Sequence, residues 1–119
     1  MLERPKIRTA IPKRRYQIGD YAATLLGEIE SEDSHRYRFI LAWVRHGDVQ
    51  PCLYVVSDEA PEQSDSNGTP FRLVVVNDVL TEVFDTDERW GDLEVFADQA
   101  LRLGTQYLGL QREAQVRLL

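Results

Sequence analysis

The longest regular pattern in the chain lies in residues 85–110, where apolar residues return every three or four positions. This spacing places them in one stripe along a helix of 3.6 residues per turn, and the charged residues fall mostly outside the stripe. Asp85, Thr86 and Asp87 offer one helix start, with Glu88 at the spacing of a capping box, and Gly91-Asp92 offers a second start after a short separate turn. Gly104 packs inside the helix or ends it, and Gly109 is the better stop. The stripe contains Trp90, Leu93, Ala97, Ala100, Leu101, Gly104, Tyr107 and Leu108.

Five shorter runs before this helix have the alternating or β-branched character of strands. Their connections are short, whereas a parallel pair would need a crossover of about a dozen residues. The pattern therefore predicts an α+β fold: an antiparallel meander of about five strands, strongly curled and packed by one long C-terminal amphipathic helix. The predicted strands are residues 21–30, 36–46, 49–56, 71–76 and 79–84.

Several of these runs are apolar on both faces, although one helix can cover only one face of a sheet. Strict alternation in residues 36–46 puts Tyr37, Phe39, Leu41 and Trp43 on one face, and Arg36, Arg38, Ile40, Ala42 and Val44 on the other. The second face is covered by a strong curl of the sheet, by the arm and tail of the chain, or by a second copy. Isologous dimerisation is the common solution for such a face. The interface predicted on that basis consists of Ile40, Val44, Val74 and Val76.

Length and charge suggest how the chain is divided. Its 119 residues suit one domain, and residues 1–15 carry six cationic side chains against one carboxylate within a chain of net charge −6. Pro5 and Pro12 argue against a helix there. We expect a basic, mobile N-terminal arm (1–15), a single domain (16–110) and a C-terminal tail (111–119). The arm either lies against its own acidic body or extends towards nucleic acid, whose phosphates the acidic body repels.

The motifs of nucleotide, cofactor and hydrolase families are absent, so we predict no catalytic residue, cofactor or metal. His35 and His46 stand at opposite ends of one predicted strand, about 35 Å apart, and cannot share a zinc ion with Cys52. The carboxylates of the 57–70 loop lack the spacing of a calcium-binding EF-hand. A single cysteine, no signal-like segment and no apolar run of about 18 residues favour a cytoplasmic protein without a membrane span.

Three function hypotheses follow from these observations. The first is a non-enzymatic protein-interaction module that homodimerises and holds an unidentified partner with an exposed sheet face or the acidic 57–70 loop. The second is a small enzyme or ligand-binding protein with a pocket between the curled sheet and the helix. The third is nucleic-acid binding through residues 1–15, which the acidic body makes the weakest. The predicted pocket is lined by Tyr21, Tyr37, Trp43 and Tyr107, with Arg36, Arg38 or Arg45 at its rim.

Overall fold

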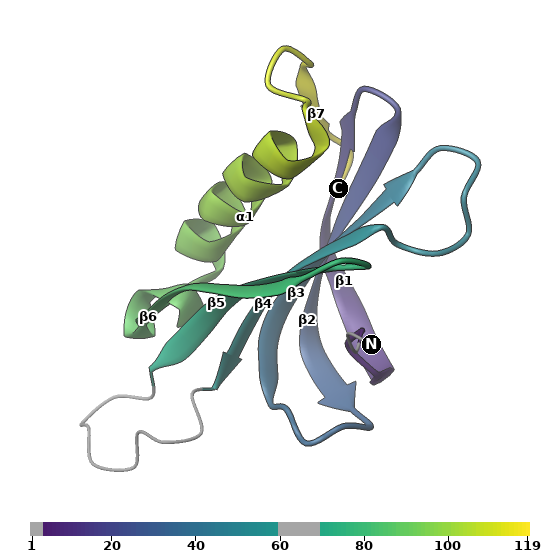
Figure 1. Cartoon of the computed structure of the whole chain (residues 1–119). Coiled ribbons are helices and arrows are strands. Elements are labelled where there is room, and N and C mark those ends of the chain that lie inside the picture. The colour runs from purple at the N-terminus through teal and green to yellow at the C-terminus, as the bar shows by residue number, and fades with distance from the viewer. Residues whose placement is uncertain (1–3, 60–69) are drawn as a thin grey trace.

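The computed structural model describes residues 4–59 and 70–119, which form an open antiparallel sheet with one helix lying across it (Figure 1). The described strands number seven rather than about five, and their order is β6-β5-β4-β3-β2-β1-β7. The α+β class and the antiparallel meander are therefore confirmed, and the sheet does not close on itself. The elements are β1 (Ile7–Ile18), β2 (Tyr21–Ser31), β3 (Tyr37–Arg45), β4 (Leu53–Glu59), β5 (Phe71–Asn77), β6 (Thr81–Asp87), the 3₁₀ helix η1 (Glu88–Gly91), α1 (Leu93–Leu108) and β7 (Gln115–Arg117).

The two unexpected strands come from the segments assigned to the arm and the tail. Residues 7–15 were expected outside the sheet, but they form most of β1 and pair with β2. Pro12 is tolerated because it lies beside a register shift on the outer strand. β7 has only exposed residues and pairs with Tyr16–Ile18. Residues 7–15 and β7 lack the apolar alternation that identifies a half-buried strand, and most of their side chains are exposed.

The helix begins at the second of the two starts that the sequence offered, since residues 88–91 form η1, and it ends at Gly109. The Asp92 side chain accepts a hydrogen bond from the Val95 N–H at 3.1 Å, and Gly109 ends the helix with a left-handed φ of 68°. Gly104 lies against the fully buried Trp43, and a Cβ at this position would stand 2.1 Å from the indole. The helix therefore packs directly on β3, with Phe96 and Leu103, which the predicted stripe omitted, also buried.

A β-bulge at the start of β3 breaks the alternation on which the sequence interpretation depended. The register of β3 against β4 shifts between Tyr37 and Phe39. Tyr37 consequently packs with Ile40 on the second face, whereas strict alternation had placed it with Phe39. The Arg38 guanidinium lies 5.0 Å from the centre of the Phe39 ring, so the prediction that aromatics and arginines occupy opposite faces is wrong here.

The second face carries its own apolar cluster, which the N-terminal segment helps to cover. Residues 4–6, here called the strap, run past this cluster. At one end of the strap, Arg4 donates hydrogen bonds to the Pro51 carbonyl oxygen and to the Asp78 carboxylate. At its other end, the strap reaches Asp33. Pro5 lines a small cavity over the cluster, and the Lys6 N–H donates to the Asp33 carboxylate at 3.0 Å. Of the predicted dimer interface, Ile40, Val74 and Val76 are buried within the single chain, and Val44 is half-buried.

Candidate functional site

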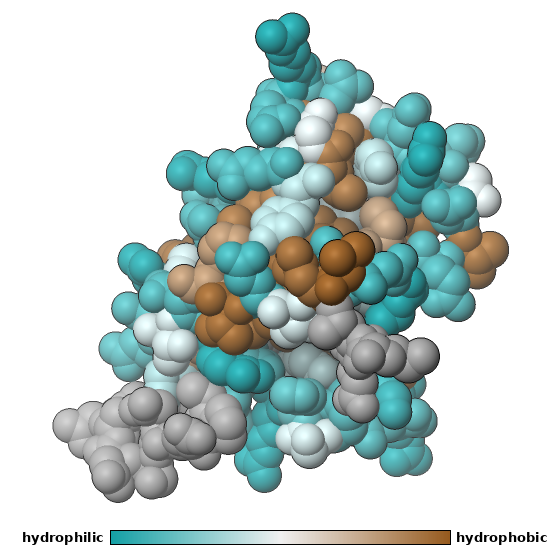
Figure 2. All heavy atoms as spheres, in the orientation of Figure 1, coloured by the Kyte–Doolittle hydropathy of each residue, from teal (hydrophilic) through white to brown (hydrophobic). Residues whose placement is uncertain are grey.

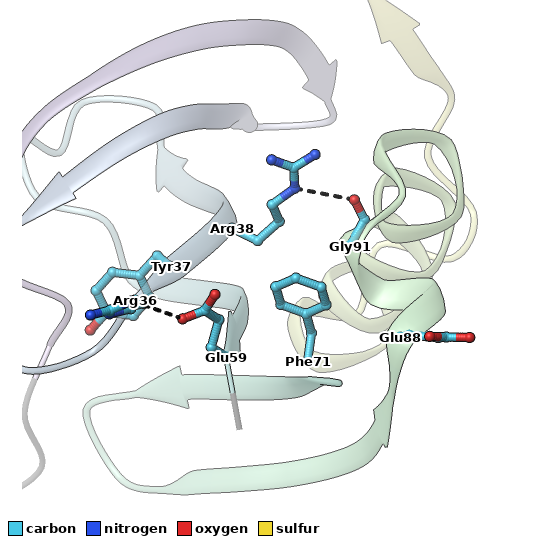
Figure 3. A pocket seen from close by; sticks show the side chains of 7 residues that line it. All are labelled: Arg36, Tyr37, Arg38, Glu59, Phe71, Glu88 and Gly91. Carbon is cyan, nitrogen blue, oxygen red and sulfur yellow. Dashed lines mark hydrogen bonds and ion pairs between the residues drawn. The ribbon is translucent and has the colours of Figure 1, made fainter. Parts of the chain in front are cut away.

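A groove of about 540 Å³ lies at the end of the sheet where β3 and β5 begin and β4 ends, beside η1 (Figure 3). Three residues that the sequence predicted to line a pocket, Arg36, Tyr37 and Arg38, lie in this groove. The predicted pocket, however, was between the helix and the sheet. The groove is also lined by residues that were not predicted from the sequence, among them the aromatic Phe71. The lining residues are Arg36, Tyr37, Arg38, Glu59, Phe71, Glu88 and Gly91.

The charges of this groove largely offset one another. Arg36 is 84% exposed and lies 3.8 Å from the Glu59 carboxylate. The Nε of Arg38 donates to the Gly91 carbonyl oxygen at 3.2 Å, which aims the guanidinium across the groove towards η1 (Figure 3). With Glu88 added, the lining contains two guanidinium groups and two carboxylates. The groove is therefore broad and open, without the enclosed, convergent polar groups of a typical small-molecule site.

The other predicted pocket residues lie elsewhere: Tyr21 and Arg45 pair with each other at the far end of β3, and Trp43 and Tyr107 lie under and on α1. Trp43 is buried in the core beneath α1, and its indole N–H has no hydrogen-bond partner among the described residues. The Tyr107 hydroxyl donates to the Glu82 carboxylate at 3.1 Å, and its ring meets Phe84 edge-on at 6.1 Å. The space between helix and sheet is filled there by side chains, including those of Phe96, Ala100 and Leu101.

A buried ion pair occupies the second face, at a place where the sequence predicted a loop. β4 extends through Glu59, so Asp58 lies inside the sheet and is only 2% exposed. Arg72 on β5 donates to both Asp58 carboxylate oxygens, at 2.9 and 2.6 Å, and this interaction raises the pKa of Arg72. His35 Nδ1 lies 3.2 Å from the same carboxylate. The ion pair borders a cavity of about 80 Å³ beneath Pro5, too small for most cofactors.

The two ends of the sheet differ in how they are protected against pairing with another chain. The β1 end carries Pro12, four cationic residues and three register shifts, and β7 covers its last three residues. Such features are the usual protection of an edge strand. β6 stands at the opposite end, and no described strand pairs with its outer side. It contains no proline, lysine or arginine, and its pairing with β5 has one register shift, between Leu73 and Val74. Its charged side chains are all carboxylates, on Glu82, Asp85 and Asp87, which disfavour pairing with an acidic strand.

Apolar side chains accompany the open edge of β6. Val83 is 49% exposed and Phe84 is 42% exposed, and Val79 in the preceding turn is 82% exposed. β6 crosses in front of the other strands in Figure 1, and apolar surface gathers along its course in Figure 2. An unpaired backbone edge beside exposed apolar groups is the arrangement by which sheets accept an added strand. The sequence contained only part of this signal: residues 79–84 have the pattern of a strand without proline, lysine or arginine, but nothing in them shows that the strand stands at the edge of the sheet.

The remaining chemical candidates lie apart from one another. Within residues 4–59 and 70–119, no three His, Cys, Asp or Glu side chains are arranged to hold a metal ion, and no helix has the length and apolar character for a bilayer crossing. Burial raises the pKa of Cys52, which disfavours the nucleophilic thiolate. The acidic loop proposed as a partner site lies mostly in residues 60–69, outside the described residues.

Comparisons with protein-family models, with curated proteins and with solved structures find no match.

Proposed function

We propose that the chain is a cytoplasmic, non-enzymatic interaction module that binds an extended segment of a partner protein along the outer edge of β6. The observation that carries the proposal is the contrast between this edge and the protected β1 edge. Backbone N–H and C=O groups on an open edge supply affinity, and neighbouring side chains supply selectivity. The single cysteine, which has no second cysteine to form a disulfide, supports a reducing compartment.

Homodimerisation through Ile40, Val44, Val74 and Val76 stays a prediction. Three of these residues are already buried in one chain, so this interface requires the strap to move away first. The β6 edge requires no such rearrangement. An added strand is therefore the better supported mode of association.

To test the proposal, peptides that bind the whole protein are selected from a random library. Their binding sites are then mapped by amide NMR. We expect the largest shifts in residues 81–87 and new protection of their outward-facing amides from hydrogen exchange. Val83→Lys should weaken binding, whereas Val79→Lys, which adds the same charge in the adjoining turn, should weaken it less. Peptides that map to other surfaces and ignore Val83→Lys would contradict the proposal.

The groove of Figure 3 supports a second candidate, the binding of a small polar ligand. The observation in its favour is that Arg36, Tyr37 and Arg38 meet there beside the Phe71 ring. A fragment screen by NMR tests it, with Arg38→Gln as the site variant and Arg45→Gln as a matched change at the other end of β3. Fragment hits that keep their affinity in Arg38→Gln would remove this candidate.

A further inference from the structure

We infer that the strand accepted by β6 is basic, with lysine or arginine at alternating positions and apolar or β-branched residues between them. This inference rests on the proposed function, since it names the chemistry of the partner at that same edge. It follows from how the side chains of β6 are divided between the two faces of the sheet.

The helix side of β6 is a row of carboxylates. Glu82, Asp85 and Asp87 pair with residues of β5 that lie in or against the core beneath α1. Directly paired residues on neighbouring strands project to the same side of a sheet. The three carboxylates therefore share one side, and side chains of an added strand would meet them at every second position.

The middle carboxylate of this row, that of Asp85, stays charged at neutral pH because its pKa is lowered. Arg89 and Trp90 both donate to Asp85, and the hydrogen bond from Arg89 is the main reason that the pKa of Asp85 is lowered. Residues 81–89 contain four carboxylates and one guanidinium group, a net charge of −3. Phe84, half-exposed between the acids, offers a ring face on which a cation can also rest.

On the opposite side of β6, different side chains of an added strand would fit. Thr81 and Val83 pair with Val76 and Val74, which belong to the apolar cluster of the second face. An added strand would meet hydroxyl and methyl groups there, without a charge. Apolar or β-branched residues suit such a surface because they extend the cluster outwards. The two sides together define an alternating basic and apolar partner.

A second copy of the chain fits this edge poorly. Pairing β6 with another β6 sets one row of carboxylates against another, which is unfavourable. The β1 strand of a second copy has the right charge, but its register shifts, Pro12 and the covering β7 obstruct its outer side. Head-to-tail pairing would also form a ring or an open filament instead of a simple dimer. Charge and edge protection thus point to a partner other than this chain.

The test uses three eight-residue peptides with blocked ends: alternating Lys and Val, alternating Glu and Val, and four Lys followed by four Val. Affinity is measured by fluorescence anisotropy at low and at physiological salt, and the site is mapped by amide NMR. We expect the Lys-Val peptide to bind at β6 about tenfold more tightly than the Glu-Val peptide, since several cross-strand charge pairs act together. The difference should shrink with salt.

Two comparisons separate strand pairing from general attraction to an acidic protein. The block peptide has the same charge as the Lys-Val peptide and should bind more weakly. Glu82→Gln, which keeps the acceptor for Tyr107, should weaken Lys-Val binding about threefold, whereas Glu30→Gln on β2 should leave it unchanged.

The outcomes distinguish the inference from the proposed function. Equal binding of the Lys-Val and Glu-Val peptides at β6 would overturn the inference and leave the proposed function standing. Concentration-dependent protection of the β6 amides without peptide would make a second copy the occupant and also overturn the inference. If no peptide, selected or designed, perturbs β6 and the edge stays unprotected, the proposed function itself fails.

Discussion

The two faces of the sheet are stabilised by different physical means. The face beneath α1 is filled by large apolar side chains, with Trp43 pressed against a helix glycine. The opposite face has a smaller cluster, and polar contacts complete it: the Asp58–Arg72 pair inside the sheet and the strap outside it. The first face should therefore be sensitive to volume, and the second to charge, chain length and pH.

The largest effect is expected from added volume on the helix face. Gly104→Ala places a methyl group where Trp43 leaves no room, and overpacking outweighs the better helix propensity of alanine. We expect a loss of about 3 kcal/mol in the free energy of unfolding, measured by urea denaturation. Gly109→Ala meets no neighbouring atom and should lose only about 1 kcal/mol through its left-handed backbone. Equal losses for the two variants would show that this face tolerates volume.

The second face should respond to charge. Arg72→Val leaves the buried Asp58 carboxylate without its main partner, which should cost about 2 kcal/mol, less than for a fully buried pair because Arg72 is partly exposed. The double variant Asp58→Val with Arg72→Val removes both charges and should recover most of that loss. Urea denaturation of the single and double variants measures the coupling. A double variant less stable than Arg72→Val would mean that the pair stabilises more than an apolar contact.

Shortening the chain should uncover the second face without disturbing the first. Deletion of residues 1–5 removes the Arg4 hydrogen bonds and the Pro5 lid, with an expected loss of about 1 kcal/mol. The exposed apolar surface should then promote self-association, detected by light scattering coupled to size exclusion. Arg4→Ala, which keeps the chain in place, is the control and should stay less associated. A truncated protein with unchanged stability would mean that the strap contributes little.

On the second face, acid should produce the smallest of these effects. Burial raises the pKa of Asp33, but hydrogen bonds from the Lys6 N–H, the Tyr37 hydroxyl and the His35 N–H outweigh it, so the net pKa is lowered. A carboxyl group whose pKa is lower in the folded state stabilises the protein at neutral pH and loses this contribution as the pH falls below about 4. The contribution should stay under about 1 kcal/mol, because Asp33 is partly solvated.

Stability measured across pH 3 to 7 in Asp33→Asn tests this assignment. The variant should be slightly less stable than the parent at neutral pH, and the difference should vanish in acid. Hydrogen exchange at Lys6 should accelerate in the parent as Asp33 becomes protonated. A difference that persists in acid would assign the effect to packing instead of ionisation.

The candidate site was only partly readable from the sequence. Arg36, Tyr37 and Arg38 were selected together and do share a groove, because they are consecutive in the chain. Phe71 also lines this groove, because β5 pairs with β4 across the connecting loop. No local pattern in the sequence predicts that Phe71 lies beside these residues. The bulge after Tyr37 reverses the face of one aromatic residue, and two-residue periodicity assumes that no such insertion occurs.

The sequence by itself determined the elements whose side chains repeat with a period: the C-terminal helix with its stop and two candidate starts, the central strands and their antiparallel order. The physical reason is local, since periodic apolar spacing and capping residues act within one segment. Only the tertiary structure decided that residues 7–15 and 115–117 join the sheet, that the strap helps to cover the second face, and that β6 is left with an open edge. These features depend on backbone pairing and contacts between distant segments, which leave no repeating signal in the chain.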